Sequence, residues 1–415
     1  MTKCFYPRNV HLDSESDLNL LTINSGSSSL KVARYRLGKT ETRTILANVD
    51  RIGSPISHIH VTDPKNHSLF DREEKIPDHG TAIRLLLSSI EQQGSSSNID
   101  GVGHRVVLGD RRCIQPQLIS EPLLRTLKEH AELAPDHVPQ LIEIIETVMR
   151  VYPNVPQAAC FDSAFHSQMP RTTQMYALPR RFFEEGIWRY GFHGLSCEYV
   201  IQELIAVDPS AGDGRVIVAH LGNGSSLTAV DHGISIDTSM GLTPLAGLVM
   251  GTRCGDLDPG ALLYLMNRRG MTFNELNDLL NKESGLLGLS EYSADMRDLI
   301  ERESTDTRCA EAIAIFCYRV RKFIGAYTAA LGGLDTLVFT GGIGEHAAVI
   351  RDRICTGLHC IGITLDAGAN DSNAAVISAK NSPVTVRVIQ TNEDLMIARH
   401  TRRLITSSNI DTVKQ

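Results

Sequence analysis

Two similar segments lie far apart in this chain, and both place a Gly- and Ser-rich turn between apolar, β-branched stretches. The first, "LTINSGSSSLKV", covers residues 21–32, and the second, "VIVAHLGNGSSLTAV", covers 216–230. Flexible linkers have a similar composition, but a linker is not bracketed twice by strands. Each segment therefore predicts a strand, a tight turn and a second strand. Small residues at such turns let backbone N–H groups point at a bound oxyanion, so the pair predicts two similarly built halves that both bind phosphate.

A third Gly-rich turn, "GGIG" at 341–344, follows a strand predicted over 337–340 and a helix predicted over 308–331. Residues 342–347 also match the G-x-G-x-x-A pattern of dinucleotide-binding enzymes, with Asp366 about twenty residues later. That alternative ranks lower, because the fingerprint belongs to an isolated βαβ unit and this turn follows two other phosphate-type turns. A helix N-terminus beside a nucleotide fits both interpretations.

Composition narrows the class of protein. The chain has 415 residues, 42% of them hydrophobic and 21% charged, which is typical of a globular enzyme of two or three domains. A formal net charge of −7 argues against a nucleic-acid partner. Nine scattered Cys without a C-x-x-C pair indicate reduced thiols in the cytoplasm, and we expect no membrane segment because no apolar run reaches about 18 residues. Residues 1–17 and 406–415 are expected to be a disordered extension and a frayed tail.

Two buried strands end in polar side chains. "DGVGHRVV" carries Arg105, and "QAACFDSAFH" carries Asp162 directly after its apolar run. The ends of strands are where α/β sheets place their chemistry. Between these strands an amphipathic helix is predicted from about residue 139, and Tyr152-Pro153 stops it, so 151–157 is a plausible boundary between domains.

A long Gly- and Pro-rich loop surrounds Arg253 within residues 235–258. An Arg in such a loop is a candidate clamp for an oxyanion, and the alternative is an exposed, solubilising Arg. Directly after the loop, Asp258 as N-cap, Pro259 at the first helical position and Gly270 as the stop predict a short apolar helix.

Taken together, these segments resemble the acetate kinase family, the acetokinases of the sugar-kinase, Hsp70 and actin superfamily, from about residue 19 to 405. Eight motifs occur in the family's order: "INSGSSSLK", "GHRVV", "FDSAFH", "YGFHG", "HLGNGSS", "DTSMGLTPLAGLVMGTRCGDLDPG", "FTGGIGE" and "TNEDLMIARH". The resemblance implies two α/β domains of the actin-like, ribonuclease H-like kind, with mixed sheets flanked by helices and a central active-site cleft. The first would span 18–160, completed by a C-terminal helix at 394–405. The second, nucleotide-binding domain would span 161–393. Family members are usually homodimers.

The resemblance also implies reversible phosphoryl transfer from ATP to acetate, giving acetyl phosphate and ADP, with Mg²⁺ or Mn²⁺. Asn24 and Glu393 would organise the metal ion. The catalytic residues would be Arg105, Asp162, His193 and Arg253, and the acetate would meet Arg105, Val107, Phe192 and Pro244. Contacts to ATP would come from Ser27, Ser29, Lys31, His220, Leu221, Gly222, Asn223, Gly224, Asp295, Met296, Arg297, Gly342, Ile343, Gly344, Glu345 and His346.

Physical chemistry supports this set independently. A carboxylate that attacks a phosphoryl group brings an anion towards other anions, so the protein must supply positive charge and alignment. Arg105 and Arg253 can form bidentate pairs with oxyanions, and His193 can donate to an equatorial oxygen. Because a carboxylate needs no general base at pH 7, we favour Asp162 as an orienter of Arg105 or of a magnesium-bound water, with a capping or turn Asp as the alternative. Glu393 also fits the start of a helix.

Other histidines have weaker cases. His104, His166 and His220 are more often satisfied by neighbouring groups than catalytic, and His137 is a weak active-site candidate.

Several positions depart from the family's pattern. Asp136 stands where a Leu of the acetate-binding wall is expected, and Val138 where an Asn is expected, while "VVLGD" replaces "VVHGG" at 106–110. His346 replaces an Asn beside the nucleotide. A carboxylate beside a methyl group is costly to desolvate, so propionate or butyrate is the runner-up substrate. A nucleotide switch of the actin or Hsp70 kind and a dinucleotide-dependent oxidoreductase are further alternatives.

Overall fold

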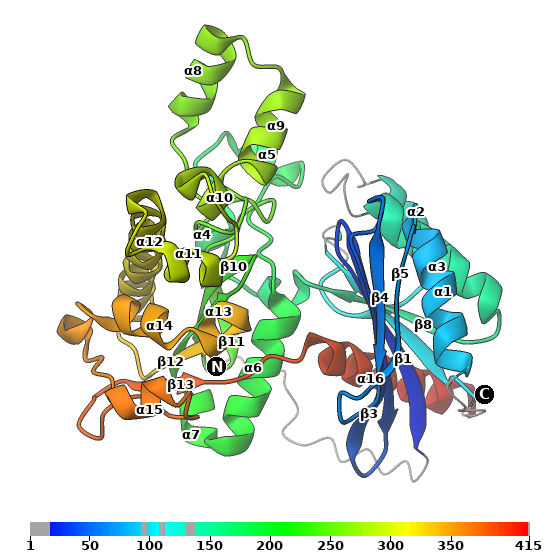
Figure 1. Cartoon of the computed structure of the whole chain (residues 1–415). Helices are drawn as coiled ribbons and strands as arrows, with labels where there is room; N and C mark the ends of the chain where they lie inside the picture. The colour runs from blue at the N-terminus through cyan, green and yellow to red at the C-terminus, as the bar shows by residue number, and fades with distance from the viewer. Residues whose placement is uncertain (1–16, 93–97, 108, 110–112, 130–137, 414–415) are drawn as a thin grey trace. The chain divides into compact units, whose positions relative to one another are not determined.

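The computed structural model describes residues 17–92, 98–107, 109, 113–129 and 138–413. The described residues form two compact units (Figure 1). Unit 1 spans 165–391, and unit 2 combines 17–164 with 392–413. The chain therefore passes from one unit to the other after residue 164 and again after residue 391. The predicted boundaries at 160 and 393 stay predictions about the limits of independently folding domains.

Unit 2 contains an eight-stranded mixed sheet with the order β5-β4-β3-β2-β1-β6-β8-β7. Its strands are β1 (Leu18–Ser25), β2 (Ser29–Leu37), β3 (Glu41–Asp50), β4 (Ser57–Thr62), β5 (Ser68–Glu74), β6 (Gly101–Val106), β7 (Gln117–Leu118) and β8 (Gln157–Phe161). Strands β1 to β5 form an antiparallel meander. Because β6 runs parallel to both β1 and β8, the carboxyl ends of these three strands lie at one edge of the sheet.

Helices cover both faces of this sheet. These are α1 (His79–Gln92), α2 (Glu121–Glu129), α3 (Val138–Val151) and α16 (Glu393–Val413). Helices α1 and α3 pack on the face that carries Leu21, Val32 and Val102. On the opposite face α16 lies so close to β6 that a Cβ on Gly103 would be 2.5 Å from Ile397 Cγ2, which explains the glycine at this position.

Unit 1 contains a five-stranded sheet with the order β11-β10-β9-β12-β13. Its strands are β9 (Arg215–Leu221), β10 (Ser225–Asp231), β11 (Ile234–Thr238), β12 (Thr336–Thr340) and β13 (Thr385–Val388). Strands β9 and β12 are parallel, and Thr340 pairs with His220 in their register. The second and third Gly-rich turns therefore leave neighbouring strands at the same edge of the sheet.

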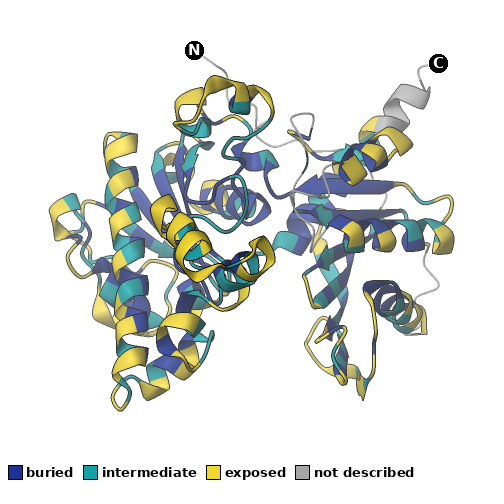
Figure 2. Cartoon of the chain, turned by 90° about the horizontal axis from the view of Figure 1, so that it is seen from above, coloured by how far each residue is buried: buried dark blue, intermediate teal, exposed yellow. Residues whose placement is uncertain are grey.

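Most helices belong to unit 1. They are α4 (Arg171–Gln174), α5 (Arg180–Glu184), α6 (Gly194–Val207), α7 (Pro209–Gly212), α8 (Pro259–Arg269), α9 (Phe273–Lys282), α10 (Gly285–Ser290), α11 (Met296–Arg302), α12 (Thr307–Leu331), α13 (Gly341–His346), α14 (Ala348–Cys355) and α15 (Ala367–Asp371), with 3₁₀ turns at Ala164–His166 and His359–Ile361. Buried residues of α12 pack on β9, β10 and β12 to form the core. Most strands of both units are largely buried, β5 being an exposed exception, while many helices keep an exposed outer side (Figure 2).

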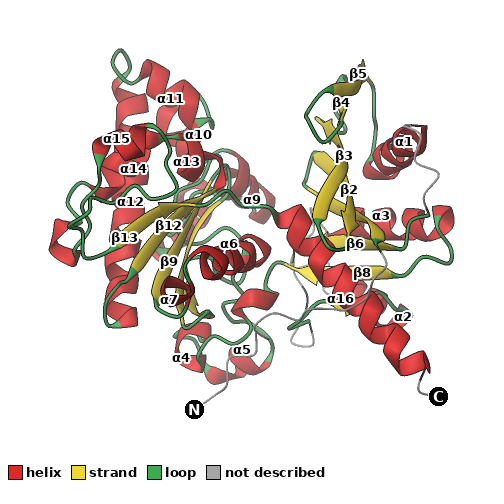
Figure 3. Ribbon diagram, turned by 90° about the horizontal axis from the view of Figure 1, so that it is seen from below, coloured by secondary structure: helices red, strands yellow, loops and turns green. Residues whose placement is uncertain are grey.

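Two mixed sheets flanked by helices confirm the predicted fold class (Figure 3). The strand–turn–strand predictions are confirmed by the antiparallel pairs β1–β2 and β9–β10. The helix predicted at 308–331 is α12, and the strand predicted at 337–340 is β12. None of the helices within the described ranges is long and apolar enough to cross a lipid bilayer.

Two local predictions need correction, and a third element differs in its exposure. Residues 151–157 connect α3 to β8 within unit 2 and do not separate the units. The tail expected to fray from 406 onward is helical through Val413. Helix α8 begins after Asp258, which caps the N–H of Gly260, and ends at Gly270 with φ of 66°, as predicted, but none of its residues is buried. Residues 1–16 of the predicted N-terminal extension lie outside the described residues.

Candidate active site

The first Gly/Ser turn is fixed by its neighbours in unit 2. Gly26 N–H donates to Ser29 O at 2.9 Å, and the carbonyl of Gly26 lies 3.0 Å from His79 Nε2. A Cβ on Gly26 would be 2.7 Å from Ser29 Oγ, so the turn has little room for a larger residue. Ser27 is exposed, and Ser29 is half-buried. The turn thus presents hydroxyls and backbone on a rigid support.

Arg105 is the centre of a polar network at the carboxyl edge of the unit 2 sheet. Its Nε and Nη2 both donate to Asp162 Oδ2, at 3.0 and 2.5 Å, and its Nη1 donates to Asn24 Oδ1 at 3.0 Å. Asn24 Nδ2 in turn donates to Glu393 Oε2 at 3.3 Å. The three strand ends and the start of α16 therefore bring together four residues that are widely separated in the sequence.

The charge of Arg105 is held firmly. Burial alone would lower its pKa, but the negative charges of Asp162, Glu393 and Asp394 outweigh burial and raise the pKa above its ordinary value. The guanidinium is 19% exposed and the Asp162 carboxylate only 1%. A fixed cation is thus available at this edge, in the geometry that favours bidentate binding of an oxyanion.

Lys31 lies on β2 beside the same edge. Its Nζ is 2.5 Å from Asp394 Oδ2, and the Lys31 side chain is 41% exposed. The second oxygen of Asp394, Oδ1, is buried and makes no hydrogen bond. Asp394 therefore orients Lys31 while leaving the ammonium group accessible.

The residues predicted to bind a metal ion fit a hard divalent cation. Asn24 and Glu393 offer an amide oxygen and a carboxylate, which are the ligand types that Mg²⁺ and Mn²⁺ prefer. Within the described ranges no group of three or more His, Cys, Asp or Glu side chains could hold a metal ion.

In unit 1, His193 lies beside the second Gly/Ser turn. It adopts a left-handed conformation with φ of 59° immediately before α6, and it is only 8% exposed. Its Nδ1 is 3.0 Å from Ser226 Oγ, and its ring centroid is 4.3 Å from that of His220. A strained backbone at a buried polar residue is typical of functional sites.

Arg253 reaches the same turn from the Gly-rich loop. A Cβ on Gly224 would lie 2.6 Å from Arg253 Nη2 and 3.1 Å from His193 Nε2. Arg253 Nη1 donates to the carbonyl of Pro244 at 2.6 Å, which fixes the guanidinium. The structure thus brings His193, Arg253 and the turn backbone together, and it does not place Arg253 as an exposed, solubilising residue.

The turn at 222–226 is held by short contacts. Ser225 Oγ donates to Gly222 O at 2.9 Å, and Gly251 N–H donates to Asn223 O at 2.9 Å. A Cβ on Gly222 would be 3.8 Å from the N–H nitrogen of Gly342, so the second and third Gly-rich turns are adjacent. Leu221, in contrast, is a fully buried core residue.

Glu345 within the third turn has a structural contact that the sequence did not reveal. Its Oε1 accepts hydrogen bonds from the N–H groups of Gly341 and Thr391, at 2.9 and 3.0 Å. Its side chain is 8% exposed, whereas that of the neighbouring His346 is 71% exposed. Glu345 therefore holds the turn together, and His346 is the member of this pair that is open to solvent.

The segment 295–297 divides in the same way. Asp295 caps α11 and pairs with Arg297, whose Nη2 is 2.6 Å from Asp295 Oδ2 and whose side chain is 84% exposed. Met296 is buried in the core beneath it. Only the two charged side chains are therefore accessible here.

Two of the remaining histidines are buried and neutral. Burial lowers the pKa of His104 and of His166 to about 4 each. His104 Nε2 contacts Gln157, and His166 contacts Ser235 Oγ and the carbonyl of Phe192. These contacts agree with the prediction that neighbouring groups satisfy both histidines.

The predicted acetate-binding residues are partly described. Phe192 is buried, while Val107 and Pro244 are half-buried. Asp136, His137, Leu108 and Asp110 lie outside the described residues, so their predicted places are untested. Val138 is buried at the start of α3.

Sequence reasoning missed several residues that hold the candidate site. Asp394, Ser196, Ser226, Thr391 and Arg351 make the supporting hydrogen bonds of its turns and side chains. None of them has a sequence signal of its own, because each contact joins segments that only the fold brings together. The Asp258-capped α8 is also followed by a pocket of about 320 Å³ that contains no predicted site residue.

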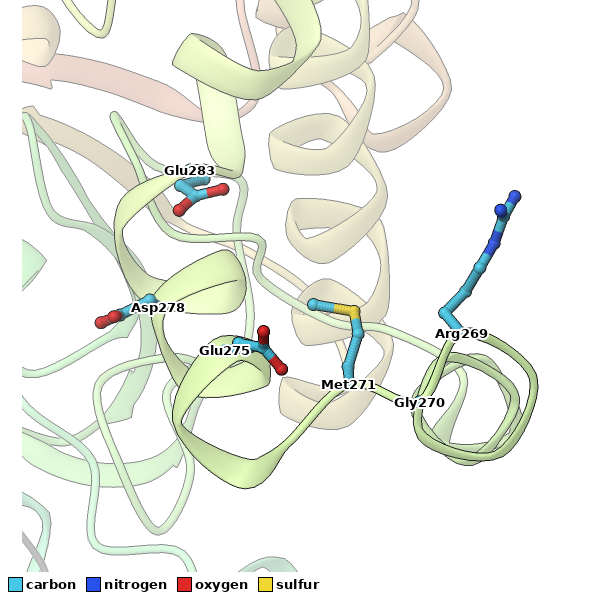
Figure 4. Close-up of a pocket in the computed structure, with 6 residues that line it drawn as sticks. All are labelled: Arg269, Gly270, Met271, Glu275, Asp278 and Glu283. Atoms are coloured by element: carbon cyan, nitrogen blue, oxygen red, sulfur yellow. The ribbon is translucent and has the colours of Figure 1, made fainter.

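This pocket lies between the end of α8 and α9 (Figure 4). Arg269 extends away from the carboxylates of α9. Glu275 is engaged by Thr272 in the cap of α9, and Asp278 is 2.6 Å from Lys282 Nζ. The carboxylates of Glu275 and Asp278 are thus engaged by contacts within α9 and its cap.

Comparisons with known proteins agree with this arrangement. A model of the acetokinase family matches residues 19–399. The acetate kinase of Halothermothrix orenii is 43% identical over 403 residues, which cover 94% of this chain and all of that protein. The crystal structure of Porphyromonas gingivalis acetate kinase matches with a TM-score of 0.85 and 36% identity, over 94% of this chain and all of that one. A propionate kinase from Francisella tularensis matches with a TM-score of 0.88 and 38% identity, over 93% and 100%.

The family match covers nearly the whole described structure, including both Gly/Ser turns and the network around Arg105. It excludes the dinucleotide-dependent oxidoreductase, in agreement with Asp366, which caps α15 instead of closing a dinucleotide site. ATP or ADP is accordingly a co-substrate, and a divalent metal ion accompanies the nucleotide. The chain belongs to the acetokinase family, the phosphotransferases that use a carboxyl group as acceptor.

Proposed function

We propose that this enzyme transfers the γ-phosphoryl group of ATP reversibly to acetate, giving acetyl phosphate and ADP. The observation that carries the proposal is the network in which Asp162 and Asn24 fix the guanidinium of Arg105. A cation held in one orientation can bind a carboxylate and align it for attack on phosphorus.

Arg105 is the proposed acetate-binding residue, and Asp162 orients it. Acetate is already ionised at neutral pH, so the reaction requires no proton removal from this substrate. Asp162 Oδ2 accepts hydrogen bonds from Nε and Nη2 of Arg105. This geometry supports an orienting role for Asp162.

His193 and Arg253 are proposed to stabilise the transferring phosphoryl group. Their nitrogen atoms converge on Gly224, at the turn whose backbone would bind the phosphates. Negative charge on the equatorial oxygens needs fixed donors, and such donors stabilise the transition state more than the ground state. Lys31, Ser27 and Ser29 of unit 2 are proposed to supply further phosphate contacts.

Mg²⁺ or Mn²⁺ is proposed as the metal ion, held by Asn24 and Glu393. When bound, the ion neutralises phosphate charge and orients the oxygens of the nucleotide. Arg105 holds Asn24 Oδ1 and so keeps the amide in one orientation. The same residue thereby links the acceptor site to the metal site.

Propionate is the second candidate acceptor. It is favoured by the similarity to the propionate kinase of Francisella tularensis and by Asp136 and Val138, which depart from the acetate kinase pattern. Acetate ranks first because acetate kinases cover this chain at up to 45% identity.

A homodimer is proposed for the assembly. Helix α8 exposes Leu263 and Tyr264, which are 67% and 59% exposed, and Phe273 at the start of α9 is 75% exposed. Figure 1 shows α8 and α9 projecting from the rest of unit 1. Exposed apolar side chains concentrated on one projecting pair of helices are typical of a protein interface.

We place the enzyme in the cytoplasm. The described Cys residues are all free thiols, and burial raises the pKa of Cys317 to about 11 and of Cys355 to about 12. Buried thiols without disulfides are typical of a reducing compartment.

Hydroxamate trapping tests the proposal. The purified chain is incubated with ATP, MgCl₂, hydroxylamine and one acid of a C2 to C4 series. The expected product is acetohydroxamate, formed with a higher kcat/KM for acetate than for propionate or butyrate. A higher kcat/KM for propionate would make propionate, and not acetate, the preferred acceptor. The absence of hydroxamate with every acid would reject the proposed function.

A further inference from the structure

A partly buried chain of hydrogen bonds runs from Thr391, the last residue of unit 1, to His220 near the end of β9. Thr391 Oγ1 donates to Ser196 Oγ at 2.8 Å, and Ser196 Oγ is 2.8 Å from His220 Nδ1. The N–H of Thr391 donates to Glu345 Oε1 at 3.0 Å. Ser196 is fully buried in the first turn of α6. The sequence assigned no role to Ser196 or Thr391.

Ser196 Oγ can donate to His220 Nδ1 or accept from it, and the hydrogen bond from Thr391 favours donation. A serine hydroxyl has one hydrogen and can also accept. Because Thr391 donates to Ser196, the hydrogen of Ser196 is available for His220 Nδ1. A ring nitrogen that accepts a hydrogen bond carries no proton, so the proton of a neutral imidazole is then on Nε2.

We propose that Thr391 and Ser196 are positioning residues that hold His220 as the Nε2–H tautomer, so that His220 donates a hydrogen bond to a nucleotide phosphate. The target of that donor rests on the proposed function. In the opposite tautomer Nε2 would present a lone pair to an anion, which is repulsive. This relay of two hydroxyl groups, from Thr391 and Ser196, therefore fixes Nε2 of His220 as a hydrogen-bond donor, whereas the ring alone could accept or donate.

The surroundings of His220 make its orientation matter for His193 as well. The two rings are tilted by 32° with centroids 4.3 Å apart, and His193 Nδ1 is held by Ser226. Register places Ser226 opposite His220 on β10 and β9. A rotated His220 ring would therefore disturb the packing of His193, whose Nε2 lies beside Gly224.

Imidazole ¹⁵N NMR of the intact enzyme, without nucleotide or acetate, tests the tautomer. The His220 signals are assigned by their loss in His220→Gln. We expect Nδ1 to resonate as an unprotonated nitrogen and Nε2 as a protonated one, and Ser196→Ala to abolish this state. A proton on Nδ1, or an unchanged spectrum in Ser196→Ala, would overturn the proposal. Because this readout needs no activity, it is independent of whether the chain phosphorylates acetate.

Kinetics of paired variants separate positioning from a general structural effect. Thr391→Val removes the hydroxyl at constant shape, and Thr391→Ser keeps it. We expect Thr391→Val and Ser196→Ala to raise the KM for ATP and lower kcat/KM for ATP about 10-fold, with the KM for acetate unchanged and Thr391→Ser close to the parent enzyme. Equal losses in Thr391→Val and Thr391→Ser, or an equal rise in the KM for both substrates, would contradict the relay. If Ser196→Ala does not fold, the Thr391 pair and the spectrum of the parent enzyme still decide the matter.

Discussion

Asp162 binds Arg105 through a single carboxylate oxygen, Oδ2, which accepts from both Nε and Nη2 of the guanidinium. Asp162 lies directly after β8 and Arg105 lies near the end of the parallel strand β6, so the ion pair depends on the register of these strands. Removing one partner of a buried ion pair is costly because the other charge stays buried. The pair therefore fixes the cation that we propose binds acetate.

Asp162→Asn is expected to lower kcat/KM for acetate at least about 100-fold, because an amide cannot hold the guanidinium as a charged acceptor does. Steady-state kinetics measures the loss. Asp335→Asn is the matched control, since Asp335 makes a similar contact with Arg215 Nε and Nη2 at the start of β12. If Asp162→Asn were as active as Asp335→Asn, Asp162 would not have the proposed orienting role.

Arg351→Met is expected to destabilise unit 1 by about 3 kcal/mol or more, since it leaves several buried acceptors unpaired. Arg351 is fully buried, and its nitrogens donate to the carbonyls of Gly344 and Glu345 and to Asn370. Urea denaturation measures the free energy of unfolding. Arg308→Met, which removes a surface ion pair with Asp306, should lower the free energy of unfolding much less. Equal losses in the two variants would show that the buried network contributes little.

Stability should fall as the pH is lowered from 6.5 towards 4. The folded-state pKa of His104 and His166 is about 4, below the ordinary 6.5, so in this range the unfolded chain binds more protons. Each histidine contributes about 2 kcal/mol at pH 7.5 that is lost by pH 5. Urea denaturation at the two pH values tests this, and His104→Gln should reduce the pH dependence of unit 2. A free energy of unfolding that is independent of pH in His104-containing protein would contradict the expectation.

Leu263→Asp should dissociate the proposed dimer. A charge in the centre of an apolar interface must be desolvated without a partner. Sedimentation velocity is expected to show a dimer for the parent chain and a monomer for the variant. Val207→Asp is the control, because Val207 is 66% exposed but lies at the end of α6. A monomeric parent chain, or dissociation by Val207→Asp alone, would exclude α8 as the interface.

The sequence predicted the elements whose signals are local. The Gly/Ser turns between β-branched strands, the Asp258 cap and the Gly270 stop depend on neighbouring residues, and each is present in the structure. The exposure of α8 could not be predicted, because Leu263 and Tyr264 look like core residues until the packing of the helix is known.

The candidate site was predicted in its principal residues but not in its supports. Arg105 and Asp162 stand at strand ends, which is a recognisable position, and their mutual contact was the favoured interpretation. Asp394, Ser196 and Thr391 were missed, since their contacts depend on how α16, α6 and the segment before residue 392 meet the sheets. Glu345 was assigned to the nucleotide, yet its carboxylate is engaged by Gly341 and Thr391.

We propose that Arg105 and Arg253 act in one phosphoryl transfer. A double-mutant cycle with Arg105→Ala and Arg253→Ala, read as kcat for acetyl phosphate formation, tests it most directly. The expected result is that each single variant loses at least about 100-fold and that the double variant is little worse than either, because residues that act in one step are not additive. Losses that multiply in the double variant, or a single variant with the activity of the parent enzyme, would contradict the claim.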